Sequence, residues 1–198
     1  MKMTFYFCSM FTRYQLVTIC FWLVSEIYWG VHSRGNKETV LQQRTFIRMF
    51  AVISIYAAFA LIYIPYLSIG VLAVRLVPQT DVFGIAGTVL CGSGISLSIW
   101  SRSTLGKNWS GPVTLKKDHD LIRNGPYAIV RHPIYFGSLV SLTGSAVTTG
   151  EVRGFVGVLL VLYPLMKKMD EEESLLGNHF TEYADYRMRV KRLIPFIY

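Results

Sequence analysis

The sequence predicts an all-α integral membrane protein, built as a bundle of about five transmembrane helices with a cytosolic C-terminal amphipathic helix. Three observations support this fold class. Hydrophobic residues make up 52% of the 198 residues and charged residues only 16%, and the mean hydropathy is positive, which is unusual for a soluble domain. The charged residues are grouped, so that they separate long apolar runs. Lysine and arginine gather in alternate connectors, which is typical of a multi-pass membrane protein.

The apolar runs are the predicted transmembrane segments. They comprise residues 14–31, 49–74, 82–100, 133–149 and 154–166. A helix needs about 20 residues to cross the apolar part of a bilayer, so the last two runs are short. Pro65 is expected to kink the second segment, and Glu26, the one acid of the first, is expected to face protein or to lie near an end. The third run is rich in glycine and serine, which predicts a helix that packs closely against a neighbour.

The distribution of positive charge predicts the orientation in the membrane. The connector after the first run, the connector after the third run and the tail carry all but four of the 20 lysine and arginine residues. If all five runs cross the membrane, these three regions lie on the same side. The positive-inside rule then places them in the cytosol and the N-terminus outside. The formal charge of +8 is explained in this way without a nucleic-acid partner.

The cysteine and histidine residues indicate neither a disulfide framework nor a metal site. Cys8, Cys20 and Cys91 lie in apolar runs and form no motif, so we interpret them as small buried hydrophobic residues. The histidine residues have no spacing that would gather a metal ion.

The charged tail has the pattern of one amphipathic helix. An apolar stripe with helical spacing is formed by Leu176, Phe180, Tyr183, Tyr186 and Val190. Pro195 would end this helix. Basic residues follow the stripe, so the helix could lie on anionic lipid, or it could pack over the mouth of the bundle.

The richest stretch in titratable side chains is HDLIRNGPYAIVRHPIYFG, at residues 119–137. Gly125 and Pro126 predict a turn, and Pro133 suits the first position of a helix. Arg131 and His132 would then stand at a helix N-terminus, whose N–H groups and partial positive charge favour an anionic group. The alternative is that these two residues only anchor the helix at the level of the lipid headgroups.

A second set of charged residues opens the tail. Lys168 and Glu172 are four residues apart, so they share one face of a helix. They lie beside an acidic run at residues 170–173. This run could be an ordinary solvated surface, or it could hold a cationic ligand at the membrane surface.

The sequence resembles the isoprenylcysteine carboxyl methyltransferase family in three segments, LGKNWS, HDLIRNGPYAIVRHPIY and EESLLGNHFTEYADYRMRVKRLIPFI. The resemblance covers residues 105–198, and the first three apolar runs match only in character. It implies an integral-membrane methyltransferase that uses S-adenosyl-L-methionine, releases S-adenosyl-L-homocysteine and methylates a lipophilic substrate at the cytosolic face. Carboxyl O-methylation of an isoprenylcysteine-like group is the leading activity. Phospholipid or amine N-methylation is the alternative within enzymes, and a lipid-binding membrane scaffold is the non-enzymatic alternative.

The resemblance also implies site residues. The cofactor is expected to be bound by His119, Asp120, Leu121, Ile122, Tyr127, His132, Pro133, Ile134, Tyr135 and Glu172. Lys168 falls where the family has an arginine that contacts the substrate, and we expect it, with Arg131, to act on the substrate. A lysine offers a point charge where an arginine offers a fork for a carboxylate.

The implied partners are a prenylated or lipid substrate and the membrane lipids, without nucleic acid or metal. Residues 1–198 would form one membrane domain, in which residues 1–100 are a three-helix scaffold and residues 101–198 bind cofactor and substrate.

Overall fold

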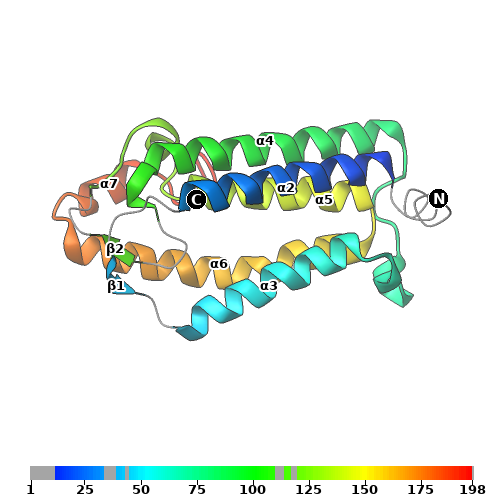
Figure 1. Cartoon of the computed structure of the whole chain (residues 1–198), viewed down its shortest axis with the longest axis horizontal. Helices are drawn as coiled ribbons and strands as arrows, with labels where there is room; N and C mark the ends of the chain where they lie inside the picture. Colours follow the sequence, from blue (N-terminus) through cyan, green and yellow to red (C-terminus); the bar gives the residue numbers. More distant parts are fainter. Residues whose placement is uncertain (1–11, 34–38, 43–44, 110–113, 117–119, 198) are drawn as a thin grey trace.

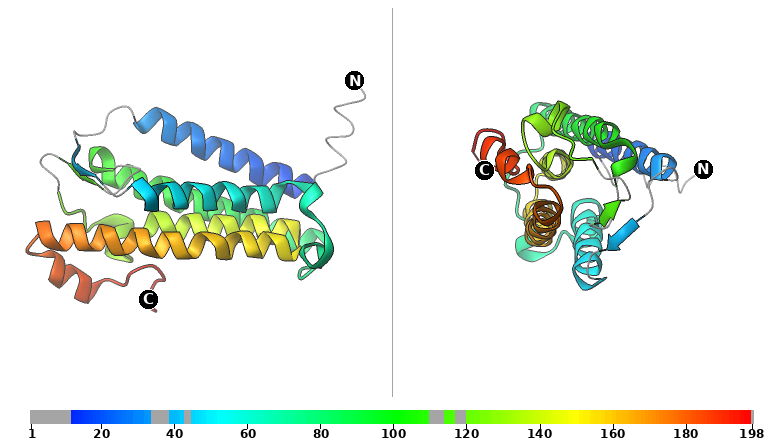
Figure 2. Two further views of the ribbon diagram at one scale, coloured as in Figure 1. Left: turned by 90° about the horizontal axis from the view of Figure 1, so that it is seen from below. Right: turned by 90° about the vertical axis from the view of Figure 1, so that its left-hand side faces the viewer.

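The computed structural model describes residues 12–33, 39–42, 45–109, 114–116 and 120–197, and this part of the chain forms six α-helices and a small sheet (Figure 1). The helices are α2 (Arg13–His32), α3 (Thr45–Tyr63), α4 (Asp81–Leu105), α5 (Pro133–Thr149), α6 (Val152–His179) and α7 (Tyr183–Arg189). The first five lie side by side along the long axis of the molecule, and α7 folds back over one end (Figure 2).

The sheet is a feature that the all-α prediction missed. β1 (Thr39–Gln42) pairs antiparallel with β2 (Thr114–Lys116), with Leu41 opposite Leu115. These strands belong to the two basic connectors, which therefore meet at one end of the bundle. Their backbone N–H and C=O groups need partners, and pairing with each other supplies them. The predicted grouping of the two connectors with the tail is thus confirmed, whereas their side of the membrane stays a prediction.

The second predicted segment is wrong at its C-terminal end. α3 stops at Tyr63 and two 3-10 turns follow, at Pro65–Leu67 and Gly70–Ala73. Pro65 has no N–H to continue the helix, and it forces Ile64 into an extended conformation (φ −87°, ψ 109°). The proline therefore ends the helix instead of kinking it. The buried side chain of Arg153 donates hydrogen bonds to the carbonyl groups of Leu61 and Ile64, both at 2.8 Å, which satisfies the end of α3.

The predicted packing role of the glycine-rich third segment is confirmed. α4 lies against α5 with glycine facing glycine: a Cβ atom at Gly94 would lie 2.4 Å from the carbonyl oxygen of Gly137, and one at Gly144 would lie 2.4 Å from the amide nitrogen of Cys91. No side chain fits between these backbones. Small residues permit such close contact between helices in lipid, and the contact holds the start of α5 firmly against α4.

The surface of the bundle is rich in exposed apolar side chains, which lie on α2, α3, α4 and α6. Among the described residues, only the region around α4, Asp81–Asn108, has both the length and the hydropathy to cross a membrane, and Arg48–Tyr63 is a shorter apolar helix. The helical bundle is confirmed, whereas the number of five spans stays a prediction. Cys91 is buried as expected, but Cys20 is exposed on α2, because it lies on the outward apolar face of that helix. Cys8 lies outside the described residues.

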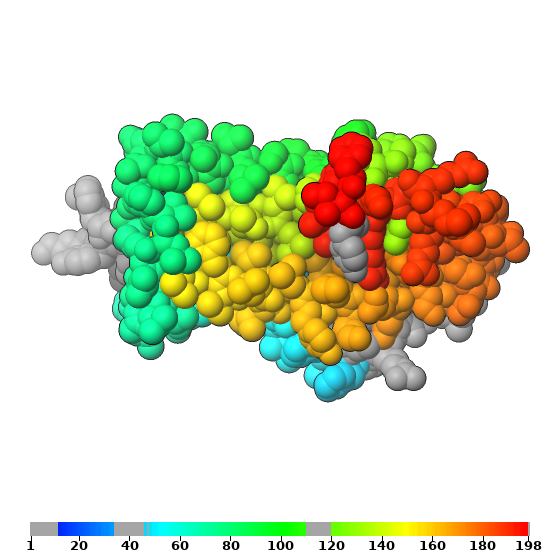
Figure 3. Space-filling model, turned by 180° about the vertical axis from the view of Figure 1, so that it is seen from behind, coloured from blue at the N-terminus to red at the C-terminus, as the bar shows by residue number. Residues whose placement is uncertain are grey.

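The tail is not the single helix that its apolar stripe predicts. α6 continues to His179, Phe180 adopts an extended conformation, and α7 begins at Tyr183. This break turns the chain, so that the tail returns along the bundle and lies over its side (Figure 3). Tyr183 and Tyr186 are buried in the fold. Of the two placements considered for the tail, packing against the bundle is therefore the observed one for these residues.

Candidate functional site

A cavity of about 420 Å³ lies toward the end of the bundle where the connectors and the tail meet. Its volume is within the usual range for small-molecule and cofactor sites, about 300–1,000 Å³. The wall includes residues of α2, α3, α5, α6 and α7, together with the segments before and after β2. The cavity wall therefore includes residues of both halves of the chain, whereas the division into a scaffold and a binding half stays a prediction.

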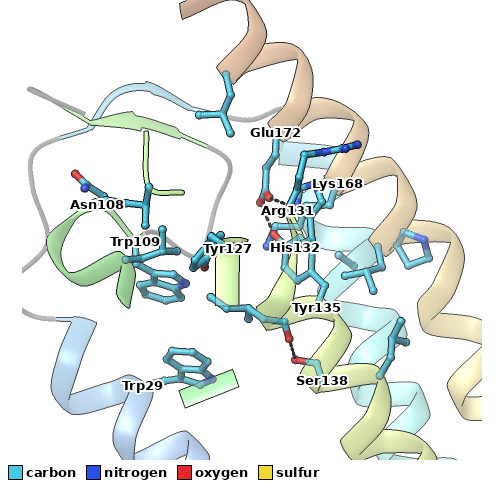
Figure 4. A pocket seen from close by; sticks show the side chains of 18 of the residues that line it. Trp29, Asn108, Trp109, Tyr127, Arg131, His132, Tyr135, Ser138, Lys168 and Glu172 are labelled. Atoms are coloured by element: carbon cyan, nitrogen blue, oxygen red, sulfur yellow. Dashed lines mark hydrogen bonds and ion pairs between the residues drawn. The ribbon is translucent and has the colours of Figure 1, made fainter. Parts of the chain in front are cut away.

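One end of this cavity is polar, and its shape depends on the turn before α5. Gly125 has φ +56°, a conformation that favours glycine, and with Pro126 it begins a short 3-10 turn, Gly125–Ala128. The turn buries Tyr127 in the cavity wall, where Tyr186 donates a hydrogen bond to its carbonyl oxygen at 2.7 Å. The predicted turn is confirmed, and Figure 4 shows Tyr127 beside His132 and Tyr135.

α5 begins as predicted, with His132 at the N-cap and Pro133 at the first helical position. The imidazole of His132 is buried and lies between two acids of α6. Its Nδ1 atom is 3.4 Å from Glu172 Oε2, and its Nε2 atom is 3.1 Å from Glu173 Oε1. The ring also stacks on that of Tyr135, whose hydroxyl group donates a hydrogen bond to Glu172. Both oxygen atoms of Glu172 therefore have a partner on α5.

The charges in this cluster reinforce one another. Burial alone would lower the pKa of His132, but the hydrogen bonds and negative charges of Glu172 and Glu173 outweigh it and raise the pKa. Burial alone would raise the pKa of Glu173, but the hydrogen bonds and charges of His132 and Arg131 lower it to about 2. The pKa of Glu172 is also lowered, against the effect of burial, by the hydrogen bond from His132 and the charge of Lys168. The arrangement thus favours the cationic form of the imidazole between the two carboxylates.

Lys168 and Glu172 lie on one face of α6, as their spacing predicts, and both line the cavity. The Lys168 ammonium lies 5.2 Å from the centre of the Tyr135 ring, a distance at which a cation is attracted to the face of an aromatic ring. Lys168 therefore stands at the polar end of the cavity, next to the apolar wall formed by the preceding turns of α6.

The guanidinium of Arg131 contacts Glu173 and the backbone of the tail. Its guanidinium forms an ion pair with Glu173 at 2.9 Å and donates to the carbonyl oxygens of Val190 and Arg187, at 2.5 and 3.1 Å. Arg131 also lines the cavity, so it holds the tail in place, and its predicted action on a substrate stays a prediction.

The other end of the cavity is apolar. Its wall includes Trp22, Ile55, Phe59, Leu139, Leu142 and Val161. Several of these side chains also belong to the hydrophobic core between α3, α5 and α6. Trp22 is oriented by a hydrogen bond from its indole N–H to the Ser145 hydroxyl, at 3.0 Å. Glu26 is the one acid that α2 adds to the wall, and the residue is otherwise exposed at the surface.

The structure brings most of the predicted site residues together. The cavity wall contains Asp120, Leu121, Ile122, Tyr127, Arg131, His132, Ile134, Tyr135, Lys168 and Glu172. Pro133 is buried at the start of α5 and is not part of the wall. His119 lies outside the described residues. The roles of all these residues stay predictions.

Sequence reasoning missed several residues of the cavity. Trp29 and Trp109 stack with ring centres 5.3 Å apart and an interplanar angle of 4°, and both line the cavity near Asn108 (Figure 4). Trp109 lies in the LGKNWS segment, but nothing in the sequence indicates that it meets a tryptophan of α2. Glu173 lies outside the cavity wall but contacts His132, and it was also missed, because it is one of four adjacent acids and the sequence does not show which of them faces the start of α5.

The fold and the site define an α-helical membrane protein with a cavity that is polar at one end and apolar at the other. Residues 87–178, just under half of the chain, match the model of the isoprenylcysteine carboxyl methyltransferase (ICMT) family, so the chain is similar to this family over that segment. The resemblance that the sequence motifs indicated is therefore confirmed.

Relatives are found among enzymes and among metal-resistance proteins. The chain is 30% identical over 98 residues to the cobalt-zinc-cadmium resistance protein CzcN of Cupriavidus metallidurans, covering 48% of this chain and 45% of that protein. It is 34% identical over 116 residues to the protein-S-isoprenylcysteine O-methyltransferase of Rattus norvegicus, covering 57% and 41%. The alignments thus span less than half of either relative.

A solved structure shares the fold. The structure of the eukaryotic intramembrane Ras methyltransferase ICMT matches with a TM-score of 0.54 and 27% sequence identity, covering 80% of this chain and 55% of that protein. Although some relatives are named for metal resistance, the described residues contain no group of three or more His, Cys, Asp or Glu residues that could hold a metal ion.

Proposed function

We propose that this protein transfers a methyl group from S-adenosyl-L-methionine to a lipophilic acceptor at the membrane surface, and that the leading acceptor is the carboxylate of an isoprenylcysteine-like group. The main support is a single cavity that joins a polar end, with Glu172, His132 and Tyr135, to an apolar end bounded by α2, α3 and α6. The polar end would suit a polar cofactor, and the apolar end would suit a lipophilic acceptor.

The residues present suit the cofactor. When bound, S-adenosyl-L-methionine supplies an electrophilic methyl group on a positively charged sulfur. Glu172 has a lowered pKa, so it stays ionised and can accept hydrogen bonds from the hydroxyl or amino groups of such a ligand. The aromatic rings of Tyr127 and Tyr135 provide flat apolar surface nearby.

The same cavity suits a carboxylate acceptor. A carboxylate is already ionised at neutral pH, so methylation requires no general base. Lys168 supplies a positive charge that would attract it, and the apolar wall would hold its hydrocarbon chain and exclude water. The protein's contribution is then to align the two reactants.

The test is methyl transfer from a labelled donor to N-acetyl-S-farnesylcysteine by the purified protein in lipid nanodiscs. Glu172→Gln is expected to weaken the binding of S-adenosyl-L-homocysteine by about tenfold or more, because a charge-assisted hydrogen-bond acceptor is lost. Glu171→Gln, which removes the neighbouring charge on the same helix, is the matched control. Undiminished binding in Glu172→Gln would disprove the cofactor assignment, and a wild-type protein that binds membranes but no cofactor would favour the lipid-binding scaffold.

A second candidate, amine N-methylation, is favoured by two features. The family resemblance implies that Lys168 stands at the position of an arginine, which would grip a carboxylate with two bonds. Glu26 adds an acid to the cavity wall that could attract a cationic headgroup. The rate of transfer distinguishes the two acceptors. An amine must lose its proton before it attacks, so the rate would rise with pH up to the pKa of that amine. We expect a carboxylate acceptor, and hence, at saturating S-adenosyl-L-methionine, a rate of transfer that changes little between about pH 7 and pH 9.

A further inference from the structure

The carboxylate of Glu173 lies within ion-pair distance of four basic side chains. Its carboxylate lies 2.9 Å from Arg131, 3.1 Å from His132, 3.3 Å from Arg192 and 3.8 Å from Arg187. The side chain is only 8% exposed, and it does not line the cavity. Burying several charges in one place is a poor way to gain stability, because desolvation offsets much of the attraction. The cluster therefore calls for an explanation besides stability.

The contacts form a chain that leads from Glu173 to the proposed cofactor site. Glu173 holds Nε2 of His132, and Nδ1 of the same ring faces Oε2 of Glu172. The other oxygen atom of Glu172 accepts the hydrogen bond from Tyr135, on which the His132 ring stacks. The position of the Glu172 carboxylate is thus determined by a ring that Glu173 orients from the opposite side.

The tail joins the cluster through its backbone as well as its side chains. The amide N–H of Arg131 donates to the carbonyl oxygen of Lys191 at 2.8 Å, and that of His132 donates to the carbonyl oxygen of Arg192 at 3.0 Å. Arg187 and Arg192, which both approach Glu173, belong to the same returning segment. The segment that carries His132 is therefore enclosed between α6 and the tail.

We propose that Glu173 is a positioning residue of the cofactor site, which orients Glu172 through His132 and fastens the tail to the start of α5. This inference rests on the proposed function, because it assumes that Glu172 contacts the cofactor. Glu173 itself would touch neither the cofactor nor the acceptor.

The proposal predicts how cofactor affinity depends on pH. A cationic imidazole has two N–H groups and donates a hydrogen bond to each carboxylate. A neutral imidazole has one N–H group, so it donates to one carboxylate and turns the lone pair of its other nitrogen toward the second. Because the pKa of His132 is raised, the cation persists on the acid side of that value and is lost as the pH rises through it. Affinity should therefore be full at lower pH and fall as the pH rises through the pKa of His132.

The pH at which half of this fall in affinity has occurred is the midpoint. Removing a negative charge near the His132 ring should lower the midpoint, and removing a positive charge should raise it. The groups that face the cluster are Glu172 and Glu173 of α6, Lys168 over Tyr135, Arg131 beside the ring, Arg187 of α7 and Arg192 of the tail. Glu173→Gln removes an anion that favours the imidazolium, so the pKa and the midpoint should fall. Arg187→Gln removes a cation near Glu173, so the midpoint should rise slightly. Arg187 is largely exposed, so this variant should fold.

The experiment measures the affinity for S-adenosyl-L-homocysteine by calorimetry between about pH 5.5 and pH 9.5, a range that lies mainly above the usual histidine pKa of about 6.5 because the pKa of His132 is raised. The proteins are the wild type, Glu173→Gln, Glu173→Asp, Arg187→Gln and the control Glu171→Gln. In Glu173→Gln we expect the midpoint to fall by about one pH unit, the usual effect of one close opposite charge. Glu173→Asp keeps the charge and should restore the midpoint, and Glu171→Gln should leave it unchanged.

Two results would overturn the inference. One is a midpoint that stays in place in Glu173→Gln while affinity falls equally at every pH, because a purely structural role would do this. The other, which remains measurable if Glu173→Gln fails to fold, is a midpoint that Arg187→Gln lowers or leaves unmoved. A wild-type protein that binds no cofactor at any pH would instead disprove the proposed function, so the two failures are distinguishable.

Discussion

At the scale of single residues, the chemistry of the site depends on Lys168 and Glu172, one turn apart on α6. Glu172 is held by His132 and Tyr135 from α5, whereas Lys168 lies over the Tyr135 ring, where the polar end of the cavity meets the apolar end. This division suggests different tasks: the carboxylate for the cofactor and the ammonium group for the acceptor.

The division predicts the effect of Lys168→Ala. If the ammonium group attracts the acceptor, kcat/KM for a farnesylcysteine acceptor should fall by about tenfold to a hundredfold, the usual cost of a lost charge-assisted contact. The affinity for S-adenosyl-L-homocysteine should change by less than about threefold, because Glu172 keeps its partners on α5. Initial rates and calorimetry on the same preparations provide the comparison. Lys168→Arg is the control, and the opposite pattern would assign Lys168 to the cofactor.

At the scale of elements, the contact between α4 and α5 positions the site. The glycine residues of the two helices leave no space for side chains, so any shift of α4 would move the start of α5 and with it His132. The turn at Gly125 and the tail then hold the same segment from other sides.

Gly94→Ala tests this contact. The added Cβ atom would lie 2.4 Å from the Gly137 carbonyl oxygen and from the Ser141 hydroxyl oxygen, so the helices must separate. The free energy of unfolding is expected to fall by about 1–3 kcal/mol, as in other overpacked interiors. Thermal unfolding in detergent measures the change.

Gly30→Ala is the matched control for this substitution, because apart from the adjoining backbone of α2 itself no atom lies within 4 Å of a Cβ atom at that position. Alanine favours helix over glycine by about 1 kcal/mol, so this variant should be equally or slightly more stable. A destabilisation of Gly30→Ala that equals that of Gly94→Ala would contradict the packing argument.

At the scale of the whole molecule, the two ends of the bundle differ in charge and in structure. One end gathers the two connectors, the β1–β2 sheet, the cavity and the tail. The opposite end contains the two 3-10 turns that follow α3 and the pairing of Arg75 with Glu151. Because most of the lysine and arginine residues lie in the connectors and tail, the positive-inside rule predicts a cytosolic site.

Labelling of introduced cysteines would test the orientation. Gln79 lies just before α4, and Ser103 lies in its last turn at the opposite end, and both are exposed. In intact cells, a maleimide that does not cross membranes should label Gln79→Cys and leave Ser103→Cys unlabelled until the cells are opened. The unchanged chain shows the background from its own cysteine residues. Labelling of Ser103→Cys in intact cells would reverse the predicted orientation.

The sequence by itself determined the helical bundle and those residues of the site that local patterns predict. Apolar runs, proline at the start of α5 and glycine at the turn act locally, so they can be interpreted without a partner. The four-residue spacing of Lys168 and Glu172 is local as well, because one helical turn places both on one face.

Only the tertiary structure decided which surfaces meet. Glu172 and Glu173 are adjacent and chemically alike, yet a rotation of about 100° per residue turns one toward the cavity and the other toward the tail. The break after His179, the end of α3 at Pro65 and the stacking of Trp29 on Trp109 likewise depend on segments far apart in the chain. Such contacts depend on how helix faces fit together, and this fit is a property of the whole fold and not of any local run of residues.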